Sequence, residues 1–392
     1  ESQLIVPSFI LKEVQDIADS NDKNRRIRGR RGLDVLDKLQ KSADIEVTVY
    51  RGTNIERMDL TNDQRLVELA SELGGGIVTN GTTTLFLSGN GGGSSHAVSV
   101  YVYAPITVSG AGASAVVAHS TTDPAVEIAE GVVVTGAADG HALLLDGPIN
   151  EVTNAGTLQT FAGGDGLVID SRIGDTTVTN KGTLTGSIKL GDGGANLLTN
   201  EAGATINSGA SIDLGGTGSF VNHGRLQQAT EGVVTTTING GFTQSEDGEV
   251  QLRVDHATGK ADGLHITGAA SMDGKLSLAT INSGSVKPGR LAIADVLVSD
   301  TGLAAGNLEL SAPASAILSY SLTNTDGRLG IQADADFTPE GLSGFGRRIG
   351  ELLGRVQSEA ASEYSKAITA GLVSISVPCE AVTQLGGTRW SI

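Results

Sequence analysis

The chain has few of the residues that usually reinforce a compact fold. It contains one cysteine, Cys379, so no disulfide can form within it. Aromatic residues make up 3% of its 392 residues, so any core must consist mainly of Val, Ile, Leu, Ala and Thr. No run of 18 apolar residues occurs, which excludes a helix that spans a membrane. The start at Glu1 shows no basic and apolar signal peptide.

Basic residues and glycine are distributed very unevenly along the chain. Residues 1–80 hold 12 of the 27 Lys and Arg residues but only 6 of the 55 glycines. The net charge is −17, and −15 of it falls after residue 80, which argues against a general nucleic-acid role. The pattern changes near Gly81, so the two regions are expected to fold differently.

The first 80 residues alternate between strand and helix patterns. Apolar residues favour strands at 4–6, 45–49 and 77–79, and helices at 9–17, 33–39 and 66–73. Strands that alternate with helices predict a small α/β fold with a parallel sheet. The basic stretch at 23–31 could grip phosphates or form a solvated loop and helix start. It contains no aromatic residue for base stacking, which favours the solvated loop and helix start.

Three stretches of this region carry a family resemblance. They are VPSFILKEVQDIADS at 6–20, RGRRGLD at 28–34, and LVELA leading to GGGIVTN between 66 and 80. Together they resemble the PIN-domain nucleases of the bacterial PIN–TRAM branch. That resemblance implies a cluster of about four carboxylates that holds Mg²⁺ or Mn²⁺ and activates water against an RNA phosphodiester.

The resemblance transfers only part of that site to this sequence. Glu13 matches the acid on the first helix, and Asp63 matches the acid that opens the helix before the glycine-rich strand. Gly81 stands where the family places its next acid, and the strand that carries its first acid would lie upstream of Leu4. Two carboxylates bind a divalent cation poorly, so residues 1–80 are expected to be a truncated fragment without nuclease activity.

A short motif recurs through the glycine-rich region. Its copies are VTNAGTL at 152–158, VTNKGTL at 178–184, LTNEAGATI at 198–206 and FVNHGRL at 220–226. This period predicts a mostly β protein whose residues 82–335 form a right-handed parallel β-helix, with Asn and Gly providing left-handed corners. At ~22 residues per coil it would have about eleven or twelve coils and a length of roughly 55 Å. The side chains expected to stack in successive coils are Val152, Val178, Leu198 and Val221.

The order of these repeats resembles the passengers of bacterial autotransporters (type V secretion). ADGLHITGAA at 261–270 and GKLSL at 274–278 look like the autochaperone-like end of such passengers, near 240–340 of a β-helix over 82–340. Helical spacing after Pro339 predicts a helical linker and tail over 341–392. The resemblance implies a location at the cell surface or outside the cell, and an outer-membrane barrel that is missing here. It also implies a protein or glycan ligand.

No other motif points to chemistry. The histidines lack metal-ligand spacing and are expected to lie at the surface or at corners; they are His96, His119, His141, His223, His256 and His265. The glycine-rich segments at 110–115, 163–166 and 191–194 are predicted to be turns, not dinucleotide or calcium sites. Cys379 has no identifiable base partner.

Two functional hypotheses therefore stand side by side. The first is a non-enzymatic β-helical passenger fragment, an adhesion or interaction scaffold that needs no cofactor, joined to a PIN-like fragment as a chimera. The alternative is a PIN-type ribonuclease dependent on Mg²⁺ or Mn²⁺, with a β-solenoid appendage and RNA as its partner.

Overall fold

The computed structural model describes residues 2–41, 45–50, 65, 69, 77–79, 83–89, 99–120, 124–191, 194–359 and 361–375. The chain forms two compact units, one of Glu1–Ile77 with Tyr103–Pro105 and one of Val78–Val102 with Ile106–Ile392. Strands account for 47% of the residues, and the main feature is a parallel β-solenoid of about seven turns. The predicted fold class is confirmed, with a small α/β part at the N-terminus and helix at the C-terminus.

In its described residues between 2 and 50, the first unit combines a two-stranded parallel sheet with two helices. Strand β1 (Ser2–Pro7) pairs with β2 (Ile45–Tyr50), and the connection between them consists of α1 (Ser8–Ala18) and α2 (Lys23–Gln40). A helical crossover is what parallel pairing of two strands requires. The predicted third helix at 66–73 lies mostly outside the described residues.

The basic stretch at 23–31 lies within α2, so the predicted helix start is present and the predicted loop in this stretch is not. Asp22 caps the start of α2: its Oδ1 accepts a hydrogen bond of 2.8 Å from the backbone N–H of Arg25. That bond lowers the pKa of the Asp22 carboxyl. Gly29 is needed for helix packing, since a Cβ there would overlap the backbone of Ala18 on α1. A glycine that suggests a loop in the sequence thus marks a close contact between helices.

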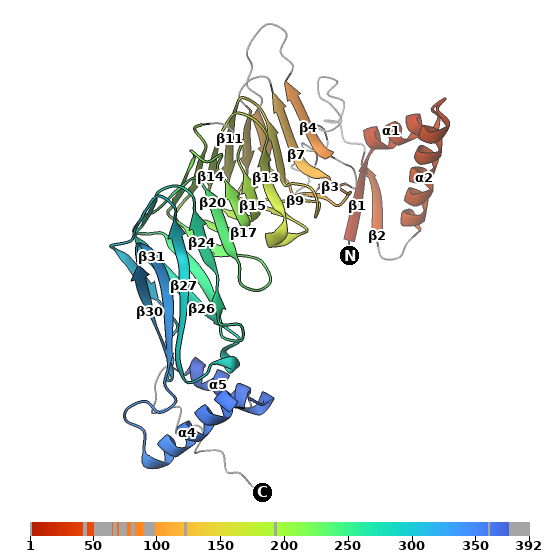
Figure 1. Cartoon of the computed structure of the whole chain (residues 1–392). Coiled ribbons are helices and arrows are strands. Elements are labelled where there is room, and N and C mark those ends of the chain that lie inside the picture. Colours follow the sequence, from red (N-terminus) through yellow and green to blue (C-terminus); the bar gives the residue numbers. More distant parts are fainter. Residues whose placement is uncertain are drawn as a thin grey trace. The chain divides into compact units, whose positions relative to one another are not determined.

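The second unit is built from strands that stack in three columns (Figure 1). The first column is a nine-stranded sheet, called sheet C here, of β5 (Ser99–Val102), β8 (Ala125–Ile128), β11 (Ile149–Asn154), β14 (Asp175–Asn180), β16 (Leu197–Asn200), β18 (Ser219–Asn222), β21 (Gly241–Gln244), β25 (Ala270–Met272) and β28 (Leu303–Ala304). The second contains β3 (Ile77–Thr79), β6 (Ile106–Val108), β9 (Val133–Gly136), β12 (Thr157–Thr160), β15 (Thr183–Lys189), β17 (Thr205–Asp213), β19 (Arg225–Gln228), β22 (Glu249–Asp255), β26 (Gly274–Ile281) and β29 (Leu308–Ser311).

The third column runs through β4 (Thr83–Gly89), β7 (Ser114–Ser120), β10 (Leu143–Asp146), β13 (Leu167–Ser171), the second halves of β15 and β17, then β20 (Thr235–Asn239), β24 (Gly263–Ile266) and β27 (Gly289–Ser299). The stack ends in antiparallel pairs formed with β23 (Lys260–Ala261), β30 (Leu318–Thr325) and β31 (Arg328–Ala335). The expected eleven or twelve coils were too many, because some coils exceed ~22 residues and the last strands leave the parallel stack.

Each of the three strand columns contributes stacked apolar side chains to the solenoid core. In sheet C, Val152 pairs with Val178, Val178 with Leu198, and Leu198 with Phe220. The expected member Val221 instead pairs with Thr199 and is half-buried. Side chains alternate between the two faces of a strand, so a shift of one residue moves a side chain from the core to the surface.

The repeated asparagines form a buried ladder at the end of the sheet C strands. The Nδ2 groups of Asn154, Asn180 and Asn200 each donate a hydrogen bond of 2.8 Å to the Oδ1 of the next asparagine, and the last acceptor is Asn222. All four side chains are 0% exposed, and none has the left-handed backbone that the sequence predicted for them. Their role is to satisfy amide groups along the stack.

The glycine two residues after Asn154, Asn180 and Asn222 has a different role from the predicted left-handed corner, whereas the copy at Asn200 places a glycine with φ of 83° at Gly203, as predicted. Gly156 and Gly182 do not have positive φ angles. A Cβ on Gly182 would overlap the carbonyl oxygen of Gly156 in the preceding coil, and a Cβ on Gly156 would overlap that of Val132. Glycine is required here because successive backbones approach closely at the turn.

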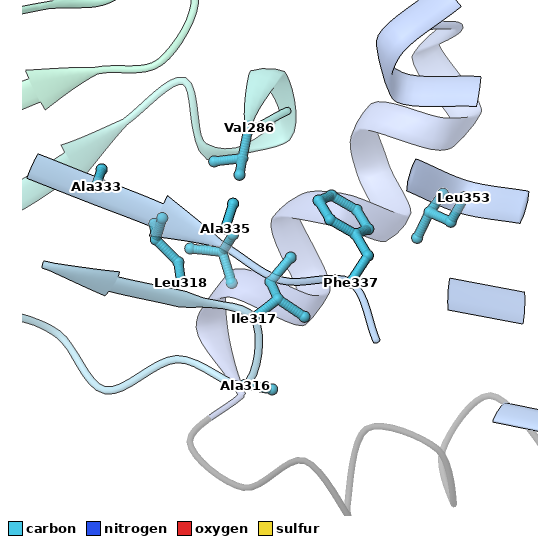
Figure 2. Packing of buried hydrophobic residues seen from close by; sticks show 9 residues of the cluster. Val286, Ala316, Ile317, Leu318, Ala333, Ala335, Phe337 and Leu353 are labelled. Atoms are coloured by element: carbon cyan, nitrogen blue, oxygen red, sulfur yellow. The ribbon is translucent and has the colours of Figure 1, made fainter. Parts of the chain in front are cut away.

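The predicted C-terminal helix is present as two helices, α4 (Gly344–Glu359) and α5 (Glu363–Ser374). Figure 2 shows Phe337, just after β31, near Leu353 of α4 and close to Ile317, which precedes β30, and to Ala335 at the end of β31. The α4 backbone can approach Phe337 because Gly350 lies against its backbone carbonyl and Gly354 against its side chain. The helices therefore pack against the end of the second unit through one apolar cluster.

We expect Asn180→Ala to lower the free energy of unfolding by about 2 kcal/mol or more, because it removes the donor to the buried Oδ1 of Asn200 and one acceptor of the buried Nδ2 of Asn154. Urea unfolding measures this change. Asn207→Ala is the matched control: its side chain bonds to Thr185 and Gln227 on the half-exposed outer surface, so its loss should cost under about 1 kcal/mol. Equal losses in both variants would contradict a structural role for the ladder.

We expect Gly182→Ala to destabilise the solenoid by about 1–3 kcal/mol, because the added methyl group must push apart two consecutive turns. Gly194→Ala serves as the control, since a Cβ at Gly194 has nothing within 4 Å. Thermal unfolding of the two variants should separate them by several degrees. A harmless Gly182→Ala would show that the turns are not closely packed.

Candidate functional site

The metal ligands expected from the nuclease resemblance are only partly visible. Glu13 lies on an exposed face of α1, whereas Asp63 and Gly81 lie outside the described residues. Among the residues that the structure describes, no group of three or more His, Cys, Asp or Glu side chains could hold a metal ion. The pairing of Glu13 with Asp63 therefore stays a prediction.

Helix α2 presents a cationic surface. Arg25, Arg28, Arg30 and Arg31 are exposed, and Arg26 donates through Nη1 to the carbonyl oxygen of Ser20 at 3.1 Å. Such a surface can contact a polyanion through charge alone.

Three coils of the solenoid bring together a serine, a histidine and an aspartate. Ser114 Oγ lies 3.0 Å from His141 Nδ1, and His141 Nε2 lies 3.7 Å from Asp170 Oδ2. Burial lowers the pKa of His141 below its ordinary value of 6.5, and the charge of Asp170 partly opposes that shift. Because the unfolded chain takes up this proton more readily, the stability contributed by His141 is lost as the pH falls below about 6.5.

This arrangement of residues resembles that of a serine hydrolase, but its surroundings do not suit the reaction. An acyl-transfer site needs free N–H donors beside the nucleophile to bind the developing oxyanion. The N–H of Ala113 donates to Gly110 and that of Ala115 donates to His141, both at 2.9 Å. Ser114 itself is 3% exposed. The cluster therefore acts as a buried polar contact between coils.

The other described histidines also have partners on neighbouring parts of the stack. His119 lies 2.9 Å from Asp146, His223 lies 2.9 Å from Ser245, and His265 lies 2.9 Å from Asp300. His256 lies 2.8 Å from the hydroxyl of Tyr320, and His96 is outside the described residues. The sequence predicted a surface or corner location for these histidines but not their partners. Each partner lies at least 22 residues away along the chain, so local spacing does not indicate it. Knowledge of the coil length could have located them.

The outer face of sheet C carries a groove at its first three strands. Tyr101 of β5 lies beside Glu127 of β8, and Glu127 lies beside Thr153 of β11. With Glu151, these side chains line a concavity of about 170 Å³. Tyr101 is 51% exposed, and both glutamates are exposed. An aromatic ring, two carboxylates and a hydroxyl thus face the solvent together.

Sequence reasoning did not find this groove. Tyr101, Glu127 and Glu151 are about one coil apart in the chain, and none belongs to a recognisable motif. Only the parallel register places them together. The signal that could have located them is the outward position of alternate residues in each strand.

The predicted turns among the glycine-rich segments agree with the described residues. Residues 110–113 form a bend and turn before β7, and Gly163–Asp165 form a short 3₁₀ helix. The segment 191–194 is only partly described. In the described part of the chain, no helix is both long enough and apolar enough to cross a membrane.

Comparison with known proteins gives one informative similarity, and no protein-family model matches the chain. Over 80 residues the chain is 46% identical to the PIN and TRAM-domain containing protein YacL of Bacillus subtilis (strain 168). The match covers 20% of this chain and 21% of YacL, so the chain spans about a fifth of that relative's length. The similarity therefore supports a PIN-like N-terminal segment and does not extend to the β-solenoid.

Proposed function

We propose that this protein is a non-enzymatic binding scaffold, in which the β-solenoid presents a ligand site on its outer surface. We further propose that the scaffold acts at the cell surface or as a secreted protein, as the repeat pattern of autotransporter passengers suggests. The observation that carries the proposal is the groove formed by Tyr101, Glu127, Glu151 and Thr153. It combines exposed aromatic and polar groups on a rigid sheet.

The chemistry of this groove favours a glycan over other surface ligands. The exposed Tyr101 ring offers an apolar face on which a sugar ring can stack. Glu127 and Glu151 can accept hydrogen bonds from sugar hydroxyls, and Thr153 can both donate and accept. Because strands hold all four residues, ligand binding costs little backbone entropy.

We expect Tyr101→Ala to weaken glycan binding at least about tenfold, because an exposed aromatic anchor usually dominates such a contact. A glycan array would identify the bound sugar, and calorimetry with that sugar would measure the dissociation constant. Phe161→Ala is a matched control, since Phe161 is also an exposed aromatic residue of the solenoid, 58% exposed, and lies outside the groove. If the array shows no binding, or if both variants bind like the wild type, the proposal is wrong.

A metal-dependent ribonuclease is the second candidate, and the similarity to YacL favours it. Under this alternative, Glu13 and Asp63 would ligate Mg²⁺ or Mn²⁺, and the arginines of α2 would contact the RNA backbone. We consider it weaker because Gly81 replaces an expected acid, which leaves two of about four carboxylates.

We expect the purified chain not to cleave single-stranded RNA in the presence of Mg²⁺ or Mn²⁺, because two carboxylates hold such ions too weakly. A fluorescent RNA oligonucleotide followed by gel electrophoresis provides the measurement. Cleavage that Glu13→Gln abolishes and Asp16→Asn preserves would establish the ribonuclease instead. Asp16 is a suitable control since it is an exposed acid on the same helix.

A further inference from the structure

A cavity of about 390 Å³ opens at the C-terminal end of the solenoid, away from the sheet C groove. Its walls come from the turn at 256–259, from residues 285–291 at the start of β27, and from β30 and β31. Its volume lies within the range of about 300–1,000 Å³ that is typical of small-molecule sites.

The floor of the cavity is apolar and preformed. Val286, Leu318, Ala333 and Ala335 line it, and each belongs to the buried cluster that joins the strands to α4 and α5 (Figure 2). Gln357 of α4 donates to the carbonyl oxygen of Val286 at 3.2 Å, which fixes one wall.

A hydrogen-bonded network holds one side of the cavity in place. His256, a lining residue, lies 2.8 Å from the hydroxyl of Tyr320, which lies 2.8 Å from Oγ1 of Thr280. Burial lowers the pKa of His256, so its imidazole is neutral near pH 7. The neighbouring Asp255 is engaged by the backbone N–H of Ala257 and the hydroxyl of Thr258, at 2.9 and 2.8 Å.

The two charged residues that line the cavity are both cations. Lys287 and Arg290 line the cavity and are exposed, and no carboxylate is among the described lining residues. Arg290 bonds through Nε to Asp334 at 2.8 Å, whereas Lys287 has no ion-pair partner in the described part of the chain. In a chain with a net charge of −17, two cations beside an apolar cavity form a local exception.

We propose that this cavity binds a small amphiphilic carboxylate, with its hydrocarbon part on the apolar floor and its carboxylate beside Lys287. An apolar floor beside polar walls suits such a ligand, and a lysine ammonium pairs with a carboxylate as a charge-assisted hydrogen bond. The cavity is independent of the proposed glycan groove, so either site can be present without the other.

The test uses decanoate, and decanol as its uncharged counterpart, with the full chain and isothermal titration calorimetry. We expect saturable 1:1 binding of decanoate by the wild type and about tenfold weaker binding by Lys287→Glu. Decanol should bind both proteins equally. Lys275→Glu is the matched control, because Lys275 is a surface lysine of β26 that does not line the cavity.

A second variant tests the floor independently. Ala333→Leu fills the cavity and should abolish the binding of both decanoate and decanol, provided that circular dichroism shows a folded protein. Lys287 is exposed, so Lys287→Glu should fold normally. The test therefore stays valid even if Ala333→Leu fails to fold. Absence of saturable decanoate binding, or binding that Lys287→Glu and Lys275→Glu weaken equally, would overturn the proposal.

Discussion

The fit of each coil onto the next is the constraint on which the second unit depends. Asn154, Asn180, Asn200 and Asn222 carry it most directly, since each amide except the last donates to the next asparagine. The same Nδ2 groups also donate to backbone carbonyl oxygens one coil away, for example from Asn180 to Thr205 at 3.2 Å. Ladder and turn therefore form one hydrogen-bonded structure that requires several coils, as in other repeat folds.

This internal cohesion leaves the outer faces free to vary. Inside the stack, apolar side chains pack on one another and the amides hydrogen-bond to one another. An outward residue can therefore change without loss of the core. The groove at Tyr101 lies on such a face. The Ser114–His141–Asp170 cluster shows the opposite case, in which residue types known from catalysis serve the contact between coils. Residue identity alone does not define a catalytic site. The site also needs free hydrogen-bond donors beside the nucleophile and access for a substrate.

The ends of a solenoid present a different physical problem, because its last strands expose unpaired edges and an open core. Here the parallel stack gives way to antiparallel pairing of β27, β30 and β31, and α4 and α5 pack beside them. This change of geometry leaves the cavity beside Lys287. The N-terminal unit has a separate small sheet and a separate similarity, to a fifth of YacL, so its function is a question of its own.

The sequence by itself determined the mostly β solenoid, because units that repeat at this period bury their apolar faces only by stacking on one another. It also indicated the α/β start and the C-terminal helix, since these depend on local periodicity. Tertiary structure decided what depends on register: that Phe220, not Val221, joins the core, and that the asparagines face one another. It also decided that Tyr101 meets Glu127, because contacts between coils join residues more than 20 positions apart and no local pattern encodes them.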